Sequence, residues 1–452
     1  MGGLMQTRAA VSVALAALLL GWIAPIALAA DVSFGQPSAD ADFGRRIEFL
    51  QPMNVSEAPS RVELRLRFSD ARGPQVIEVP PPTRGGEQTL RYSLEFAEGG
   101  HLLPNTTVTA WWRVYDGPDD RRGTDGPETT LTYSDDRFTW RTLTGDIVRV
   151  HWYEGSDAFG QRALEIGERA VRETAELLGV TEDDPIDFFV YGGQAEFYDA
   201  LGPGTRENVG GQANAELRTL FALITPGEID DPWVSVVIPH ELVHLVFDTA
   251  VGNPYHFPPR WLNEGLAVYL SEGYGANDRT TVEAAARAGT LIPLDGLTGQ
   301  FPTTRDRFYL AYAESVSAVE FLIREYGRDA LISLIRSYAE GRTDDEAFTD
   351  ALGVDAGRFG EAWLADLDAQ PPLRYGPQPA PPGPQPPGWE AAPATPGSSP
   401  VASGGPGAPV PSPTPTTGAA VDPVLLVGIL SLVVAGIALA ARAARRRRSG
   451  GA

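Results

Sequence analysis

The chain has 452 residues, of which 36 are basic and 59 acidic, so its formal charge is −23. A body this acidic lacks the basic footprint that phosphate backbones require, so we exclude nucleic acid as a partner. The sequence has no cysteine, which excludes disulfides, thiolate nucleophiles and cysteine-ligated zinc. The length is too great for one small domain and predicts two folded units with non-globular segments.

The first thirty residues have the layout of a secretory signal. Arg8 gives a positive start, an apolar run follows over 9–23, and the small residues of 27–30 form a cleavage site. We therefore expect residues 1–30 to be a signal peptide. An uncleaved membrane anchor is the alternative, although the apolar run is short for a span of about 20 residues.

Residues 31–145 alternate apolar and polar side chains in the manner of half-buried strands. The alternation is clear over 62–68, 90–96 and 108–114, and turn residues such as the prolines at 80–82 separate these stretches. Several short strands with regular turns predict a β-sandwich of the immunoglobulin or fibronectin III type. We expect this domain to act as a spacer or to present substrate.

From residue 146 the pattern changes to that of a mostly helical domain. Apolar residues suited to strands occupy 147–152 and 186–191, whereas apolar residues recur at helical spacing over 159–177. Two further helical stretches are 308–326 and 328–339. We therefore expect a catalytic domain over 146–369, and the fold class of the whole body is α+β.

The C-terminal part has the composition of a tether and an anchor. Residues 370–421 are rich in proline, glycine, alanine, serine and threonine, and such a segment buries too little apolar surface to fold, so we expect it to be disordered. We expect a transmembrane helix over 422–441 and a cytoplasmic tail over 442–452, because five arginines follow the apolar run. The body would then be extracellular on a single-pass membrane protein. A sortase signal at 414–418 is the alternative, but its leading leucine is absent.

The clearest chemical signal is HELVH at 240–244, an HExxH motif. Residues four apart share one face of a helix, so His240 and His244 can reach one metal while Glu241 holds a water on it. Pro239 is tolerable if the helix begins near Ser235, because it then ends the first turn.

A catalytic zinc site typically has a third protein ligand and one open position. We expect that ligand to be Glu264, in WLNEGLA at 261–267. Nineteen residues follow His244 before Glu264 and contain glycine and prolines that let the chain turn back. The small Gly265 suits a close approach of two helices.

The two stretches together resemble those of the gluzincins, metallopeptidases that bind zinc through two histidines and one glutamate. WLNEG is similar to the corresponding sequence motif of the M1 aminopeptidases. The whole pattern looks more like the bacterial peptidase MA-like domain, and this resemblance covers roughly 147–368. The resemblance implies that His240, His244 and Glu264 bind Zn²⁺ and that Glu241 is the general base. It also implies an oxyanion-stabilising tyrosine, which we place at Tyr312, with Tyr309 as the alternative.

The resemblance also bears on the substrate. In M1 enzymes an upstream strand carries a glutamate that grips the free amino terminus, but GGQAN at 210–214 has no glutamate at the matching position. We therefore expect a zinc-dependent endopeptidase that hydrolyses peptides or proteins with a metal-activated water, and an edge strand within 211–224 that pairs with the substrate. The alternatives are an inactive adhesion or binding module with a peptidase fold, and an M1-like aminopeptidase.

The three other histidines, His101, His151 and His256, fit surface or structural roles. Asp248, one turn past His244, is a candidate partner for a zinc histidine.

Overall fold

The computed structural model describes residues 32–69, 73–96, 100–115, 123–203, 210–253 and 255–371. The predicted signal peptide, transmembrane helix and basic tail lie outside these ranges, as does the predicted tether beyond its first two residues. The chain divides into two compact units. Of the described residues, those of 32–139 and 198–203 belong to one unit, and those of 140–197 and 210–371 belong to the other.

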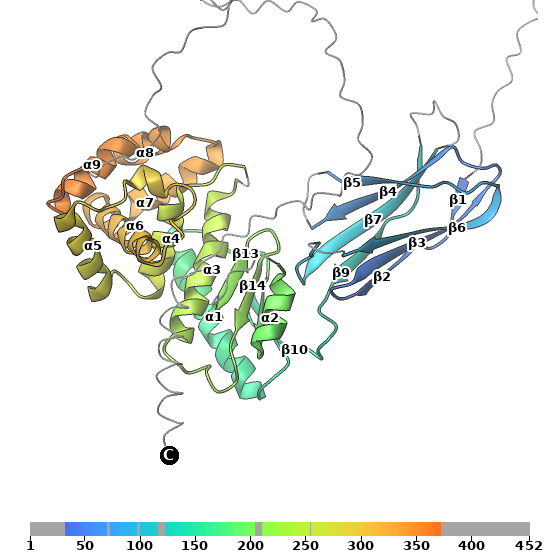
Figure 1. The fold of residues 1–452 in the computed structure, drawn as a ribbon, viewed down its shortest axis with the longest axis horizontal. Coiled ribbons are helices and arrows are strands. Elements are labelled where there is room, and N and C mark those ends of the chain that lie inside the picture. Colours follow the sequence, from blue (N-terminus) through green and yellow to red (C-terminus); the bar gives the residue numbers. More distant parts are fainter. Residues whose placement is uncertain are drawn as a thin grey trace, which may run out of the picture. The chain divides into compact units, whose positions relative to one another are not determined.

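The first unit contains two antiparallel sheets (Figure 1). The strands of one sheet are β1 (Val32–Phe34), β2 (Ser38–Asp42), β3 (Arg46–Val55) and β6 (Gly86–Glu95). In this sheet β3 lies between β1 and β2 and also pairs with β6. The strands of the other sheet are β4 (Arg61–Phe68), β5 (Gln75–Val79), β7 (Thr106–Tyr115), β8 (Thr124–Asp125) and β9 (Thr129–Tyr133). Their order is β5-β4-β7-β8, and β9 also pairs with β7. The predicted strand character of this region is confirmed.

Alternating side chains hold the two sheets together. Ile47 and Phe49 of β3 are buried, as are Val62, Leu64 and Leu66 of β4, because successive residues of a strand point to opposite faces. A specific link joins the sheets: Tyr133 of β9 stacks on Phe43 with ring centroids 5.2 Å apart, and its hydroxyl accepts a hydrogen bond of 2.6 Å from the Gly44 backbone N–H.

The second unit is built on a five-stranded mixed sheet with the order β10-β11-β12-β14-β13. Its strands are β10 (Arg141–Thr144), β11 (Val148–Trp152), β12 (Ile186–Tyr191), β13 (Gly211–Asn214) and β14 (Thr219–Leu223). The pairs β11–β12 and β12–β14 are parallel, and the two outer pairs are antiparallel. The edge strand predicted within 211–224 is therefore β13 alone, because β14 lies inside the sheet.

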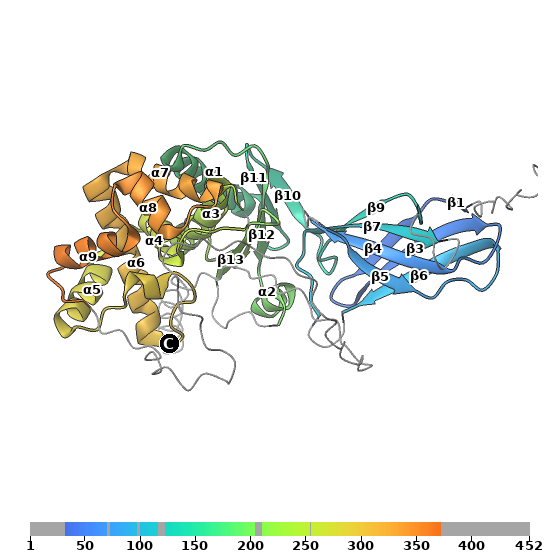
Figure 2. The ribbon, with the colours of Figure 1, turned by 90° about the horizontal axis from the view of Figure 1, so that it is seen from above.

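Helices cover one face of this sheet and extend beyond it. α1 (Asp157–Leu178) and α3 (Val234–Val251) pack on the sheet, and most of the remaining helices gather on the other side of α3 (Figures 1 and 2). The remaining α-helices are α2 (Gln194–Leu201), α4 (Arg260–Ser271), α5 (Ala276–Ala288), α6 (Arg305–Tyr326), α7 (Arg328–Ser337), α8 (Asp344–Leu352) and α9 (Ala356–Asp366). Short 3-10 turns lie at Leu294–Leu297 and Tyr338–Glu340. The predicted helical stretches are thus confirmed.

α3 is the central helix of the second unit. Among the described helices it is the one whose length and composition would suit a membrane span, but 72% of it is buried inside the unit, as is typical of a core helix. It begins at Val234, so Pro239 lies in its second turn and not at the end of the first. The proline has no N–H to donate to the carbonyl of Ser235, and the helix continues past it because packing on both sides holds it.

A buried carboxylate joins α6 to the segment before it. Both oxygens of Glu314 accept from the Ile292 backbone N–H, at 3.0 and 3.1 Å, and the residue has no exposed surface. Burial raises the pKa of Glu314 to about 8, since a desolvated carboxylate prefers its neutral form. The folded chain therefore keeps a proton on Glu314 that the unfolded chain releases near pH 4.5.

This difference predicts a pH-dependent stability. Because the folded state binds the extra proton between about pH 4.5 and 8, the free energy of unfolding should fall as pH rises through that window. The variant Glu314→Gln keeps an acceptor for Ile292 but cannot ionise, so it should be more stable than wild type at pH 8, by on the order of 3 kcal/mol. Urea unfolding from pH 5 to 8 measures this, with the exposed Glu361→Gln as control. Parallel pH slopes for wild type and Glu314→Gln would contradict the assignment.

Candidate metal centre

Three ligand-type side chains meet where α3 faces α4. His240 and His244 lie one turn apart on α3, and Glu264 projects from the second turn of α4. The Oε2 atom of Glu264 is 3.7 Å from Nε2 of His240 and 3.7 Å from Nε2 of His244. All three side chains are buried, at 4% exposure or less, and their ligand atoms lie within 4.8 Å of one another.

The polar atoms at this meeting point fit a metal ion. Among the described residues, Oε2 of Glu264 and both ring nitrogens of His240 are buried without a hydrogen-bond partner. Buried polar atoms are rarely left without a hydrogen-bond partner, because burial removes their hydrogen bonds to water and no other contact then offsets this cost in free energy. Two imidazole nitrogens and one carboxylate oxygen are a ligand set that suits Zn²⁺ with one position left for water. The group can therefore hold a metal.

Asn263 orients one of the histidines. Its Oδ1 lies 2.8 Å from Nδ1 of His244, and an amide oxygen can only accept, so Nδ1 carries the proton and Nε2 presents its lone pair toward Glu264. Burial lowers the pKa of His244 to about 4, so the ring is neutral at physiological pH. A partner of His244 is thus Asn263, the residue before Glu264, and the role of Asp248 as a histidine partner stays a prediction.

Arg260 contacts the other oxygen of Glu264. Its Nε and Nη2 donate to Oε1 of Glu264 at 3.1 and 2.9 Å. Burial alone would raise the pKa of Glu264, but His240, His244 and Arg260 lower it to about 2. The carboxylate is therefore ionised over the physiological range, as a metal ligand must be.

Glu241 contacts the edge strand of the sheet. Its Oε2 accepts a hydrogen bond of 3.0 Å from the Ala213 backbone N–H of β13. The strand can come this close because Gly211 has no side chain: a Cβ there would lie 3.0 Å from Cγ of Glu241 and 3.1 Å from Cγ1 of Val237. Burial raises the pKa of Glu241 to about 7, which is a suitable value for a group that accepts and returns a proton near neutral pH.

The two candidate tyrosines lie on α6. Tyr312 is 2% exposed, and its ring contacts Phe301 at a centroid distance of 5.1 Å. Burial lowers the pKa of the Arg260 guanidinium, but Glu264 and then Tyr312 raise it, and the Tyr312 hydroxyl is hydrogen-bonded to this guanidinium. Tyr309 is only half-buried, with Arg305 over its ring. Of the two, Tyr312 is the one that the structure connects to the ligand group, through Arg260.

Gly265 allows α6 to approach α4. A Cβ at this position would lie 2.3 Å from the carbonyl oxygen of Ser315 on α6. The prediction that Gly265 marks a close helix approach is confirmed, with α6 as the neighbouring helix. This contact sets the distance between the helix that carries Glu264 and the helix that carries Tyr312.

The remaining histidines lie outside the ligand group. Nε2 of His101 is 2.9 Å from the Ala200 carbonyl, and His151 lies between Thr142 and Asp187, 2.9 Å from each. His256 stacks on Tyr338 with ring centroids 5.6 Å apart. These contacts agree with structural roles.

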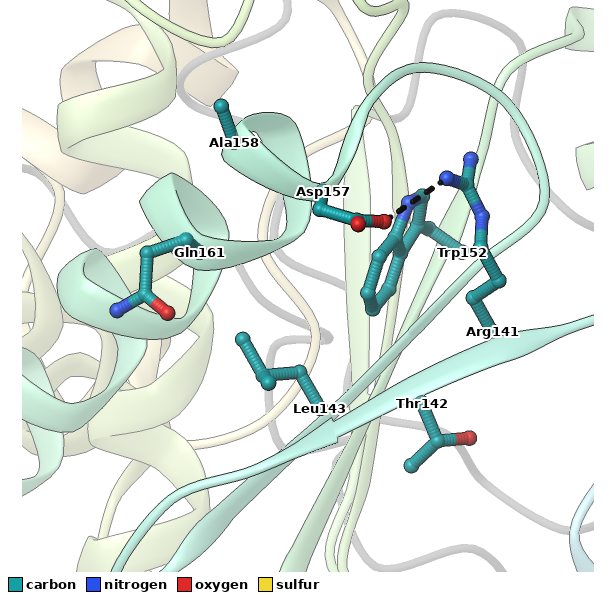
Figure 3. Close-up of a pocket in the computed structure, with 7 residues that line it drawn as sticks. All are labelled: Arg141, Thr142, Leu143, Trp152, Asp157, Ala158 and Gln161. Carbon is teal, nitrogen blue, oxygen red and sulfur yellow. Dashed lines mark hydrogen bonds and ion pairs between the residues drawn. The ribbon is translucent and has the colours of Figure 1, made fainter.

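A separate concavity of about 580 Å³ lies between β10, β11 and the start of α1 (Figure 3). Arg141 and Asp157, 3.2 Å apart, form an ion pair at its rim, and Arg141 lies over the ring of Trp152. Because β10 and β13 are opposite edges of the sheet, this concavity is not part of the metal centre.

Residues 167–369 match the family model of the Peptidase MA superfamily. The match contains HELVH, Glu264 and Tyr312. This part of the chain is therefore similar to the Peptidase MA superfamily. No curated protein matches the sequence.

Solved structures also match this chain at low similarity. An M1 zinc metallopeptidase from Deinococcus radiodurans is 15% identical, with a TM-score of 0.33, and the match covers 73% of this chain and 92% of that one. An aminopeptidase N family protein from Idiomarina loihiensis is 10% identical, with a TM-score of 0.39, and the match covers 74% of this chain and 76% of that one.

The close contact between α4 and α6 leads to a prediction about stability. Gly265→Ala should lower the free energy of unfolding by about 1–3 kcal/mol, because its methyl group overlaps the Ser315 carbonyl. The matched control is Gly360→Ala in α9, where nothing lies within 4 Å of the added methyl. That change should be neutral or stabilising by up to about 1 kcal/mol, since alanine favours helix. Urea unfolding of both variants tests this, and equal effects would contradict the close approach.

Proposed function

We propose that the chain is a zinc-dependent peptidase that cleaves internal peptide bonds outside the cell. The observation that carries the proposal is the convergence of His240, His244 and Glu264 on one buried point, with atoms that lack other partners. The Peptidase MA match covers all three residues.

Zinc bound by these three side chains would polarise the scissile carbonyl and acidify the attacking water. Glu241 is the residue that accepts the water proton and passes it to the leaving amine. Its position is fixed by the Ala213 N–H, and its pKa, raised by burial to about 7, lets it exchange that proton at neutral pH. Tyr312 would donate to the oxyanion, a contribution of on the order of 3 kcal/mol for one donor.

The substrate would lie along β13. This strand forms the edge of the sheet next to Glu241, so an extended peptide can add to it through backbone hydrogen bonds. Its four residues, GQAN, include no carboxylate that could hold a free amino terminus. This composition supports internal cleavage over removal of single residues from the amino terminus.

The proposal predicts a separation of metal binding from turnover. Glu241→Gln should keep one zinc per chain, because Glu241 is not among the three ligands, and should slow hydrolysis roughly 10²–10⁴-fold. Metal analysis and a peptide cleavage assay measure the two properties on the same sample. A pair of peptides of one sequence, with free and acetylated amino termini, should be cut alike at an internal bond.

Three results would count against this proposal. Full activity of Glu241→Gln would show that Glu241 is not the general base. If only the peptide with a free amino terminus is cut, and at its first bond, the result would instead favour an aminopeptidase. A wild-type chain with neither zinc nor activity would favour a binding module.

We also propose that the protein is anchored in the membrane with its folded body outside the cell. The predicted signal over 1–30 and the apolar run before the five C-terminal arginines support this orientation. A protease added to intact cells should digest the body and spare an epitope at the C-terminus, whereas permeabilised cells should lose both. A body that is protected in intact cells would contradict the orientation.

A further inference from the structure

The two oxygens of Glu264 have different surroundings. Both contacts from Arg260, through Nε and Nη2, go to Oε1. Oε2 has no hydrogen-bond partner among the described residues and faces the two histidines at 3.7 Å. A carboxylate whose one oxygen is held by a guanidinium presents the other in a fixed direction, and charge-assisted bonds of this kind are among the stronger ones in proteins.

Arg260 is itself held in place. It is the first residue of α4, and its backbone N–H donates to the Thr298 carbonyl at 3.0 Å. Its guanidinium lies 4.8 Å from the centre of the Phe301 ring, a favourable cation–π position, and the side chain is only 18% exposed. A guanidinium fixed by an aromatic ring and a helix start can define where the Glu264 carboxylate lies.

The same guanidinium reaches the proposed oxyanion donor. Arg260 shares a hydrogen bond with Tyr312, and since a guanidinium has no acceptor, the tyrosine oxygen accepts. Phe301 contacts both side chains, with its ring centre 5.1 Å from that of Tyr312. Arg260 thus connects one ligand of the metal centre on α4 to the phenol on α6.

We propose that Arg260 is a positioning residue of the metal centre: it holds Oε1 of Glu264 so that Oε2 alone is presented to the metal. The inference rests on the proposed zinc function. The loss of an outer partner that orients a metal ligand typically lowers metal affinity 10–100-fold. The rival role for Arg260 is to neutralise a buried charge for the sake of folding, and this role would not act through the metal.

The test is zinc affinity of the purified full-length chain, measured by competition with a chelator. Arg260→Met removes the charge and the donors while it keeps much of the side-chain length, and we expect affinity to fall about 10–100-fold. Arg260→Lys keeps the charge but has one donor nitrogen where two contact Glu264 in wild type. Its zinc affinity should therefore lie between those of wild type and Arg260→Met. Arg279→Met on α5 is the matched control, because Arg279 also lies over an aromatic ring, that of Tyr274 at 4.1 Å, and should leave affinity unchanged.

A double-mutant cycle separates positioning from folding. In a Glu264→Gln background the carboxylate is absent, so Arg260→Met should change the remaining zinc affinity less than about twofold. Wild-type affinity in a folded Arg260→Met variant, or the same loss in both backgrounds, would overturn the inference. If Arg260→Met no longer melts cooperatively, Arg260→Lys decides: reduced affinity supports the inference and wild-type affinity overturns it. A wild-type chain that binds no zinc would refute the proposed function itself, which is a different result.

Discussion

The burial of the Glu264 carboxylate is the constraint on which the candidate metal centre depends. A side chain with no exposed surface cannot carry a charge without nearby positive or polar partners, because the lost hydration is too costly. Arg260 supplies a full positive charge at one oxygen, and the two histidines face the other. α3 and α4, which carry these groups, pack against each other, and α6 packs on α4.

Glu241 shows the opposite outcome of burial. It is about as buried as Glu264, but it accepts a hydrogen bond from one backbone N–H, and no guanidinium among the described residues forms an ion pair with it. Burial raises its pKa to about 7, whereas histidines and Arg260 lower the pKa of Glu264 to about 2 despite burial. Two glutamates in one site therefore differ in protonation because of their neighbours, and such a difference suits one residue to proton transfer and the other to metal binding.

The sequence predicted what depends on local spacing. The HExxH pattern places two histidines on one helix face, and the helical periods over 159–177 and 308–326 agree with α1 and α6. The pairing of Arg260 with Glu264 also has a local signal, since residues four apart on a helix are neighbours. The contact between Asn263 and His244 has no local signal, because it depends on how α3 and α4 pack against each other, and residues far apart in the sequence decide that packing.

The arrangement of α4 has a consequence for how the domain would respond to metal. Arg260, Asn263, Glu264 and Gly265 all lie within its first two turns, so the ligand, the two orienting contacts and the close helix packing share one short segment. Any local opening of α4 would disrupt all of them together. By mass action, an ion bound there would suppress that opening, so that metal concentration and the local order of this segment are thermodynamically linked.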